Sequence, residues 1–194
     1  MPGPIAVLDA DVLVPIIACD FLLTAFDHGL YEPVVSATAL REVERTLVED
    51  LPHLDPRAIR HRVAAMRSAL DDQLVDVDPQ SVPAAINAKD RHIVGAAIQG
   101  EASLIVTNDR RLRDELDASD LALNGVDLDT FATTLWESTP AEIGLVVDSL
   151  IRKRTRRPVS RSEMLDALRN HMPNLIQQLA NDEPGRTHDR RSTQ

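Results

Sequence analysis

Two short apolar runs in this chain each lead into a carboxylate. Residues 5–8 (IAVL) precede Asp9, and residues 104–107 (LIVT) precede Asn108 and Asp109. A buried parallel strand that ends in an aspartate places that charge beyond the carboxyl edge of a sheet, where open α/β folds bind their ligands. Two such strands, with further acids at the starts of nearby helices, predict a pocket for a hard divalent cation. A cation held next to phosphate groups can promote their hydrolysis.

Runs with strand character alternate with amphipathic segments over the first 130 residues. Strands are predicted at 4–8, 31–37, 74–77 and 104–106, with a weak fifth strand near Val126. The predicted helices lie at 15–28, from Ser36 or Thr38 onward, and at 57–70, 88–99 and 111–116. This alternation predicts a three-layer α/β fold in which helices flank a central parallel sheet of four or five strands.

The pattern changes after about residue 138. Residues 139–142 (TPAE) are typical of a helix start, with a cap, a proline in the first turn and an acid after it. A second helix is predicted to open at Ser160 or Ser162. The sequence therefore predicts a sheet domain over 1–137, a helical C-terminal extension over 138–180 and a polar, disordered tail over 181–194.

Composition narrows the possible functions. Aromatic residues make up only 3% of the chain, which disfavours an RNA-binding sheet that stacks bases on rings. Because Cys19 is the single cysteine, an intramolecular disulfide and a multi-cysteine zinc site are excluded. No segment is apolar enough over sufficient length to span a bilayer, so we expect a cytoplasmic protein.

The net charge of −10 argues against a general nucleic-acid binder. Two features weaken that objection. Acids gathered at a metal site would be neutralised locally, and the basic residues are clustered around positions 110–113 and 152–157. The residues that we expect to contact RNA phosphates, with solvated surface charge as the alternative interpretation, are Arg60, Arg67, Arg110, Arg111 and Arg113.

Four acids fall where a parallel α/β sheet would gather them, namely Asp9, Glu42, Asp90 and Asp109. Each has a simpler interpretation: the aspartates can cap or complement the helices that follow them, and the glutamate can be a solvated helix residue. The prediction of a site therefore depends on all four together. Crowded carboxylates raise one another's pKa, and bound Mg²⁺ or Mn²⁺ would relieve that repulsion. The six histidines are scattered without metal-ligand spacing, so oxygen ligands are expected.

Four segments, in order, resemble the motifs of PIN domains. They are residues 7–13 (VLDADVL), 36–43 (SATALREV), 89–97 (KDRHIVGAA) and 104–109 (LIVTND). The resemblance covers about residues 4–130. It implies a Mg²⁺- or Mn²⁺-dependent ribonuclease in which Asp9, Glu42, Asp90 and Asp109 bind metal. Asp11 stands where the family usually has a small polar residue, and Arg110 and Arg111 follow Asp109 where another acid is frequent.

Many bacterial members of this family are VapC-type toxins, and the C-terminal extension resembles that of a longer subset. The resemblance thus implies a toxin of a type II toxin–antitoxin pair, with an RNA substrate, a cognate antitoxin protein and a homodimer. We expect Asp9, Asp90 and Asp109 to hold the metal, and Glu42 to bind it or to orient the attacking water. Asp11, Thr107 and Asn108 are expected to support these residues.

Two alternatives stay open at this point. Asp9 and Asp11 also fit the opening aspartate pair of haloacid-dehalogenase-like phosphatases, with Asp9 as the nucleophile. That interpretation gives Glu42 no role. The other alternative is a non-catalytic PIN-like module that binds RNA or a protein, and a complete set of four acids argues against it.

Overall fold

The computed structural model describes residues 3–77, 82 and 86–182 of the chain. In this part of the chain five parallel strands form one sheet in the order β3-β2-β1-β4-β5. The strands are β1 (Ile5–Leu8), β2 (Glu32–Ser36), β3 (Leu74–Val75), β4 (Leu104–Val106) and β5 (Asn124–Val126). The predicted fold class is confirmed, including the weak fifth strand near Val126.

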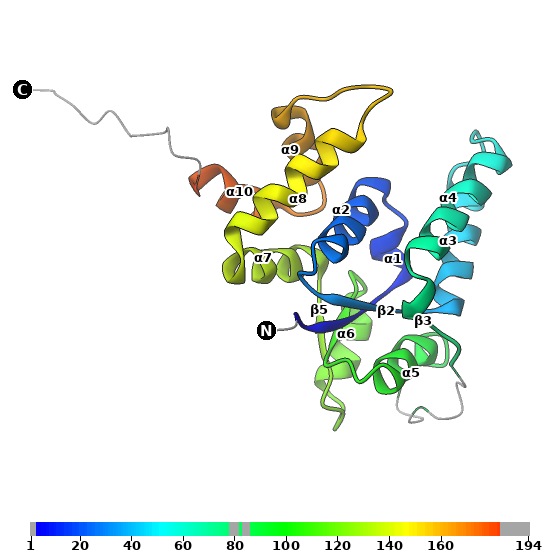
Figure 1. The fold of residues 1–194 in the computed structure, drawn as a ribbon. Coiled ribbons are helices and arrows are strands. Elements are labelled where there is room, and N and C mark those ends of the chain that lie inside the picture. Colours follow the sequence, from blue (N-terminus) through cyan, green and yellow to red (C-terminus); the bar gives the residue numbers. More distant parts are fainter. Residues whose placement is uncertain (1–2, 78–81, 83–85, 183–194) are drawn as a thin grey trace, which may run out of the picture.

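Helices cover both faces of the sheet (Figure 1). They are α1 (Ala10–Leu13), α2 (Ile16–Asp27), α3 (Ala37–Asp50), α4 (Pro56–Ala69), α5 (Arg91–Gln99), α6 (Arg110–Asp117), α7 (Leu128–Ser138), α8 (Pro140–Lys153), α9 (Arg161–Arg169) and α10 (Pro173–Asp182). A 3₁₀ turn spans Asp71–Gln73. Gly29, the predicted stop after α2, adopts a φ of 70°, a left-handed conformation that glycine reaches without strain.

Helices α1 and α7 were not among the predicted elements, and α10 was not predicted as a helix separate from α9. The single turn α1 is too short to give a periodic signal. Helix α7 contains several threonines, whose β-branched side chains lower helix propensity. It forms because Asp127 caps its first turn by accepting a hydrogen bond from the Thr130 amide, and because Leu128, Phe131 and Leu135 are buried.

The alternation of side chains along the strands divides the core in two. Val7 and Ile105 face α5 and α6 on one side of the sheet. Ala6, Leu8 and Val106 face the other side, where α1, α2, α3 and α7 pack. Burial on both faces explains why these strands are apolar throughout rather than alternating with polar residues.

The C-terminal helices lie on the same side of the sheet as α2 (Figure 1). Ile143, Val147 and Leu150 of α8 belong to the same apolar cluster as the α2 side of the sheet. The Asp129 carboxylate of α7 accepts hydrogen bonds from the Asn174 and Leu175 amides and so caps α10. The division of the chain at residue 137 stays a prediction.

Helix α10 runs to Asp182, so the first two residues of the predicted tail are helical. The remainder of that tail, 183–194, lies outside the described residues. In the part of the chain that is described, no helix has the length and apolarity needed to cross a membrane.

Candidate active site

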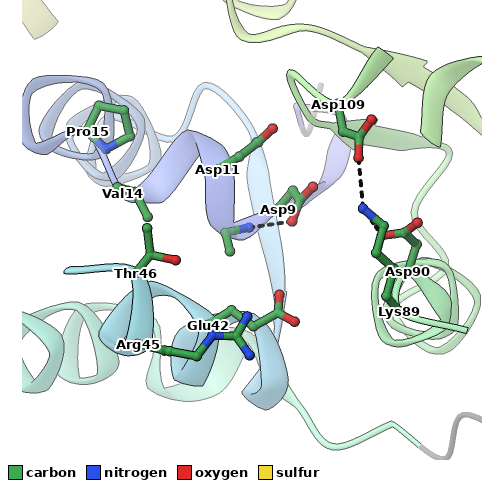
Figure 2. Close-up of a pocket in the computed structure, with 11 residues that line it drawn as sticks. Asp9, Asp11, Val14, Pro15, Glu42, Arg45, Thr46, Lys89, Asp90 and Asp109 are labelled. Atoms are coloured by element: carbon green, nitrogen blue, oxygen red, sulfur yellow. Dashed lines mark hydrogen bonds and ion pairs between the residues drawn. The ribbon is translucent and has the colours of Figure 1, made fainter. Parts of the chain in front are cut away.

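A cavity opens at the carboxyl edge of the sheet, between β1 and β4. The chain runs from β1 to β2 and β3 on one side and returns to β4 on the other, so this is the point where the strand order reverses. The cavity has a volume of about 390 Å³. Its lining residues come from several elements and are shown in Figure 2: Asp9, Ala10, Asp11, Val14, Pro15, Glu42, Arg45, Thr46, Lys89, Asp90 and Asp109. The four predicted acids and Asp11 thus lie around one space.

Asp9 is the most constrained of these acids. It follows β1 directly and its amide donates to the Val106 carbonyl, which continues the pairing of β1 with β4. Its Oδ1 accepts from the Ala10 amide at 2.6 Å, and its Oδ2 accepts from the buried Thr107 hydroxyl at 2.7 Å. Burial raises the pKa of Asp9, while the Thr107 hydrogen bond opposes that shift. Asp9 is therefore both the cap of α1 and a wall of the cavity.

Asp11 lies two residues beyond Asp9, on the first turn of α1. Its Oδ2 accepts from the Asn108 amide at 2.9 Å, and Thr107 Oγ1 lies 3.4 Å from the same oxygen. Its Oδ1 is buried and has no hydrogen-bond partner within the described residues. Burial and the neighbouring Asp9 raise the pKa of Asp11 to about 7. Asn108 in turn accepts from the Leu128 amide, which connects this loop to α7.

Glu42 reaches the cavity from α3, opposite the end of β1 (Figure 2). Its Oε2 lies 3.4 Å from Nε2 of His92, a buried residue in the first turn of α5. The His92 Nδ1 lies 2.7 Å from the Ser36 hydroxyl, and that hydroxyl also caps α3 by accepting from the Ala39 amide. The hydrogen bond with Ser36 and the contact with Glu42 thus give both ring nitrogens of the buried His92 a polar neighbour.

Asp90 and Asp109 face each other across the third side of the cavity. Asp90 precedes α5 without capping it by a side-chain hydrogen bond, and its side chain is 8% exposed. Burial raises the pKa of Asp90, and Lys89 and Arg111 oppose that shift. Asp109 caps α6 through Oδ1, which accepts from the Arg111 amide at 2.8 Å. Burial raises the pKa of Asp109 somewhat, but hydrogen bonds from Lys89 and the Arg111 amide leave it below its usual value.

Two basic side chains hold this pair of acids. Lys89 Nζ lies 3.2 Å from Asp109 Oδ2 and 3.7 Å from Asp90 Oδ1. Arg111 Nη2 lies 2.9 Å from Asp90 Oδ2. The sequence analysis did not assign a role to Lys89, although its position next to Asp90 was a usable signal. Arg45 and Thr46, which also line the cavity, were not predicted, although their positions three and four residues after Glu42 place them on the same face of α3.

The oxygen atoms that line the cavity are of the kind that a hard divalent cation prefers as ligands. The cavity offers carboxylate oxygens, which Mg²⁺ and Mn²⁺ prefer, and the unpartnered Asp11 Oδ1 is an oxygen that a cation could satisfy. As the side chains stand, no group of three acidic, histidine or cysteine residues in the described part of the chain is arranged to hold an ion. Two of the acids are engaged with Lys89 and Arg111 instead.

The arginines that were expected to contact RNA differ in their surroundings. Arg111 pairs with Asp90, and Arg113 donates to the Thr107 carbonyl at 2.6 Å, so both support the cavity from behind. Arg110 is exposed and lies 3.8 Å from Asp114. Arg60 and Arg67 are exposed on α4 and line a separate surface hollow with Glu44 and Asp71. None of these five side chains lines the acidic cavity.

Carboxylates gathered at the point where the strand order of a parallel α/β sheet reverses are typical of enzymes that transfer or hydrolyse phosphate groups. The sequence profile of the PIN domain family matches residues 6–111, a segment that includes Asp9, Glu42, Asp90 and Asp109. The chain belongs to the PIN domain family. Members of this family are generally nucleases, so the match supports a nuclease-type function and an RNA substrate for this chain. No curated protein matches the chain significantly.

Proposed function

We propose that the protein is an endoribonuclease that depends on Mg²⁺ or Mn²⁺ and cleaves RNA phosphodiesters with a metal-activated water. The observation that carries this proposal is the convergence of Asp9, Glu42, Asp90 and Asp109 from four separate elements on one cavity. A purely structural role does not account for that arrangement, because surplus buried carboxylates repel one another and destabilise the fold.

Each acid has a role in this proposal. Asp9, held at both oxygens by Thr107 and the Ala10 amide, offers a preorganised carboxylate for the metal. Asp90 and Asp109 complete the metal-binding set from the other wall. Glu42, steadied by His92, binds the ion or orients the attacking water. When bound, the ion would supply a water of lowered pKa and positive charge for the leaving oxygen.

The proposal includes a biological role as the toxin of a type II toxin–antitoxin pair, with a cognate antitoxin and a homodimeric assembly. Its support is the resemblance of the four motifs and of the C-terminal extension to VapC-type proteins. Growth arrest on expression, relieved by co-expression of the adjacent gene's product, is the expected result. If expression leaves growth unchanged while the purified protein cleaves RNA, the toxin role is wrong and the nuclease activity stands.

The direct test is cleavage of single-stranded RNA in Mg²⁺ or Mn²⁺ by the wild type and by Asp9→Asn. This change keeps the shape of the side chain and removes its charge, so we expect cleavage to fall at least about 100-fold. The matched control is Asp114→Asn, an exposed aspartate on α6, which should cleave like the wild type. Equal cleavage by Asp9→Asn and the wild type, or cleavage that persists in a chelator, would contradict the proposal.

The other two interpretations predict different results. A phosphatase would hydrolyse small phosphoesters through a covalent aspartyl-phosphate on Asp9, but the match to the PIN domain family gives that reading no support. A non-catalytic module would bind RNA without turnover in any divalent metal. The RNA cleavage assay therefore separates the nuclease from both alternatives, and hydrolysis of a small phosphoester separates the phosphatase from the non-catalytic module.

A further inference from the structure

Lys89 contributes a positive charge to a cavity that five acids line, and Arg45 is the other basic residue of that lining. Figure 2 shows its side chain reaching toward Asp109 beside Asp90, with the nitrogen between the two carboxylates. The Lys89 side chain is 55% exposed, whereas that of Asp90 is 8% exposed. The backbone of Lys89 is fixed because its amide donates to the Asn87 carboxamide oxygen. Only the flexible side chain is thus free to move.

The two acids that Lys89 contacts are also two of the proposed metal ligands. A carboxylate that faces an ammonium group at 3.2 Å, as Asp109 does, binds a divalent ion less tightly, because the two cations repel each other at short range. Lys89 and a metal ion must therefore compete for Asp90 and Asp109. Asp9, Asp11 and Glu42 make no ion pair with lysine or arginine within the described residues, so the competition falls on one wall of the cavity.

Lys89 is better suited than Arg111 to be displaced. Arg111 contacts Asp90 at 2.9 Å and Glu115 at 3.8 Å, and its backbone lies in α6. Lys89 has a long flexible side chain with a point charge, and half of it already contacts solvent. Its shorter ion pair is with Asp109, whose side chain is 33% exposed, so solvent partly screens the attraction and weakens it. A divalent ion that binds several carboxylates would therefore displace Lys89 with only a small loss of favourable interaction energy.

We propose that Lys89 is an exchangeable counter-ion: it neutralises Asp90 and Asp109 until a divalent ion takes them over, and the released ammonium then binds a phosphate group of the RNA at the mouth of the cavity. The proposal rests on the proposed nuclease function and names a substrate-binding residue for it. It makes metal binding and RNA binding mutually dependent through one side chain. It also requires that removal of Lys89 affects the two affinities in opposite directions.

The chain provides a matched control, because Lys89 and Lys153 are its only lysines. The Lys153 side chain is also 55% exposed, and its Nζ lies 3.0 Å from Asp27 Oδ2. It lines a different hollow between α2, α4 and α8. Lys89→Gln and Lys153→Gln therefore remove the same charge and a comparable ion pair, one inside and one outside the acidic cavity.

The first measurement is Mn²⁺ binding by titration calorimetry to chelator-treated wild type and both variants. Because Lys89→Gln loses the competing ammonium, it should bind Mn²⁺ about two- to fivefold more tightly than the wild type. Lys153→Gln should match the wild type. Unchanged or weaker Mn²⁺ binding by Lys89→Gln would overturn the proposal. Thermal unfolding of each variant verifies that all are folded, as expected for half-exposed side chains.

The second measurement is RNA binding, followed by stopped-flow anisotropy of a labelled single-stranded oligoribonucleotide before cleavage proceeds. With Mn²⁺ present, Lys89→Gln should bind more weakly than the wild type, and the slope of log affinity against log salt should fall by about one. In chelator the two proteins should bind RNA equally. An unchanged slope with Mn²⁺ would mean that Lys89 does not reach a phosphate and would refute the exchange.

These results are independent of the cleavage assay. If the wild type cleaves RNA and Lys89→Gln binds Mn²⁺ no more tightly, the exchange is wrong and the nuclease function stands. If Lys89→Gln behaves as expected in both binding measurements but no RNA is cleaved, the nuclease function is wrong and the exchange stands.

Discussion

The acidic cavity and the contact between α2 and α8 both bring acids against basic side chains of other elements. The two regions differ in the number of basic partners for each acid. Between α2 and α8, Asp20 pairs with Arg154 at 2.7 Å and Asp27 pairs with Lys153 at 3.0 Å. Each acid there has its own cation. Five acids line the cavity, but only Asp90 and Asp109 pair with Lys89 or Arg111, and one oxygen of Asp11 has no partner within the described residues.

The difference shows how one kind of interaction serves two purposes. Paired charges at the edge of an apolar contact help to orient α8 on α2, and none of these acids is left without a basic partner. Surplus acids in the cavity destabilise the fold through repulsion and desolvation, and under the proposed function a bound cation would offset that loss. The comparison predicts that changes in the two regions will affect stability in opposite directions.

The largest effect on stability is expected from the apolar residues beneath the paired charges. Leu150 on α8 is 1% exposed and belongs to the core shared with α2. Leu150→Ala removes buried apolar volume and should lower the free energy of unfolding by about 2–5 kcal/mol in chemical denaturation. Leu145→Ala, an exposed leucine on the same helix, is the control and should change little. Equal losses in the two variants would show that α8 does not depend on this core.

The next effect concerns the surplus charge in the cavity. Glu42→Gln should lower the rate of RNA cleavage by about 10- to 100-fold, because the carboxylate that binds the ion or orients the water is neutralised. In chelator the same variant should be at least as stable as the wild type, since one repelling charge is gone. Cleavage rates and melting temperatures of the same preparations measure both. A clear loss of stability would show that Glu42 is structural.

A smaller effect is expected from pH. The pKa of Asp11 is raised to about 7, above the value of 3.8 expected when the chain is unfolded. The folded protein therefore binds a proton more tightly here, and this contribution to stability is complete below about pH 4 and is lost as the pH rises through about 7. In chelator, the free energy of unfolding should fall over this range, and Asp11→Asn should weaken the dependence. An identical pH profile for Asp11→Asn would contradict the assignment.

Much of the fold could be predicted from the sequence because strand and helix periodicities are local. The end of β1 and the start of α3 were visible as an apolar run followed by Asp9 and as Ser36 in a capping position. Helix α7 was not visible, because its stability comes from packing against the core and not from its threonine-rich sequence. Tertiary contact decided the structure there.

The convergence of the acids was predictable because parallel strands share a carboxyl edge. The basic and histidine side chains that contact these acids were not predictable. Lys89 and His92 stood in the third motif, but the contact of His92 with Glu42 and Ser36 crosses three elements. The pairing of Arg111 with Asp90 likewise depends on how α6 lies against α5. The sequence identifies which side chains carry charge, and only the fold determines which charges neutralise each other.

The smallest effect is expected from the paired charges themselves. Lys153→Gln removes an ion pair whose two side chains are 55% and 58% exposed, so solvent already screens the attraction. The free energy of unfolding should fall by less than about 1 kcal/mol, and the difference should disappear at high salt. Chemical denaturation at low and high ionic strength measures this. A loss as large as that of Leu150→Ala would mean that α8 is held to α2 by charge, and the contrast between the balanced contact and the surplus cavity would then fail.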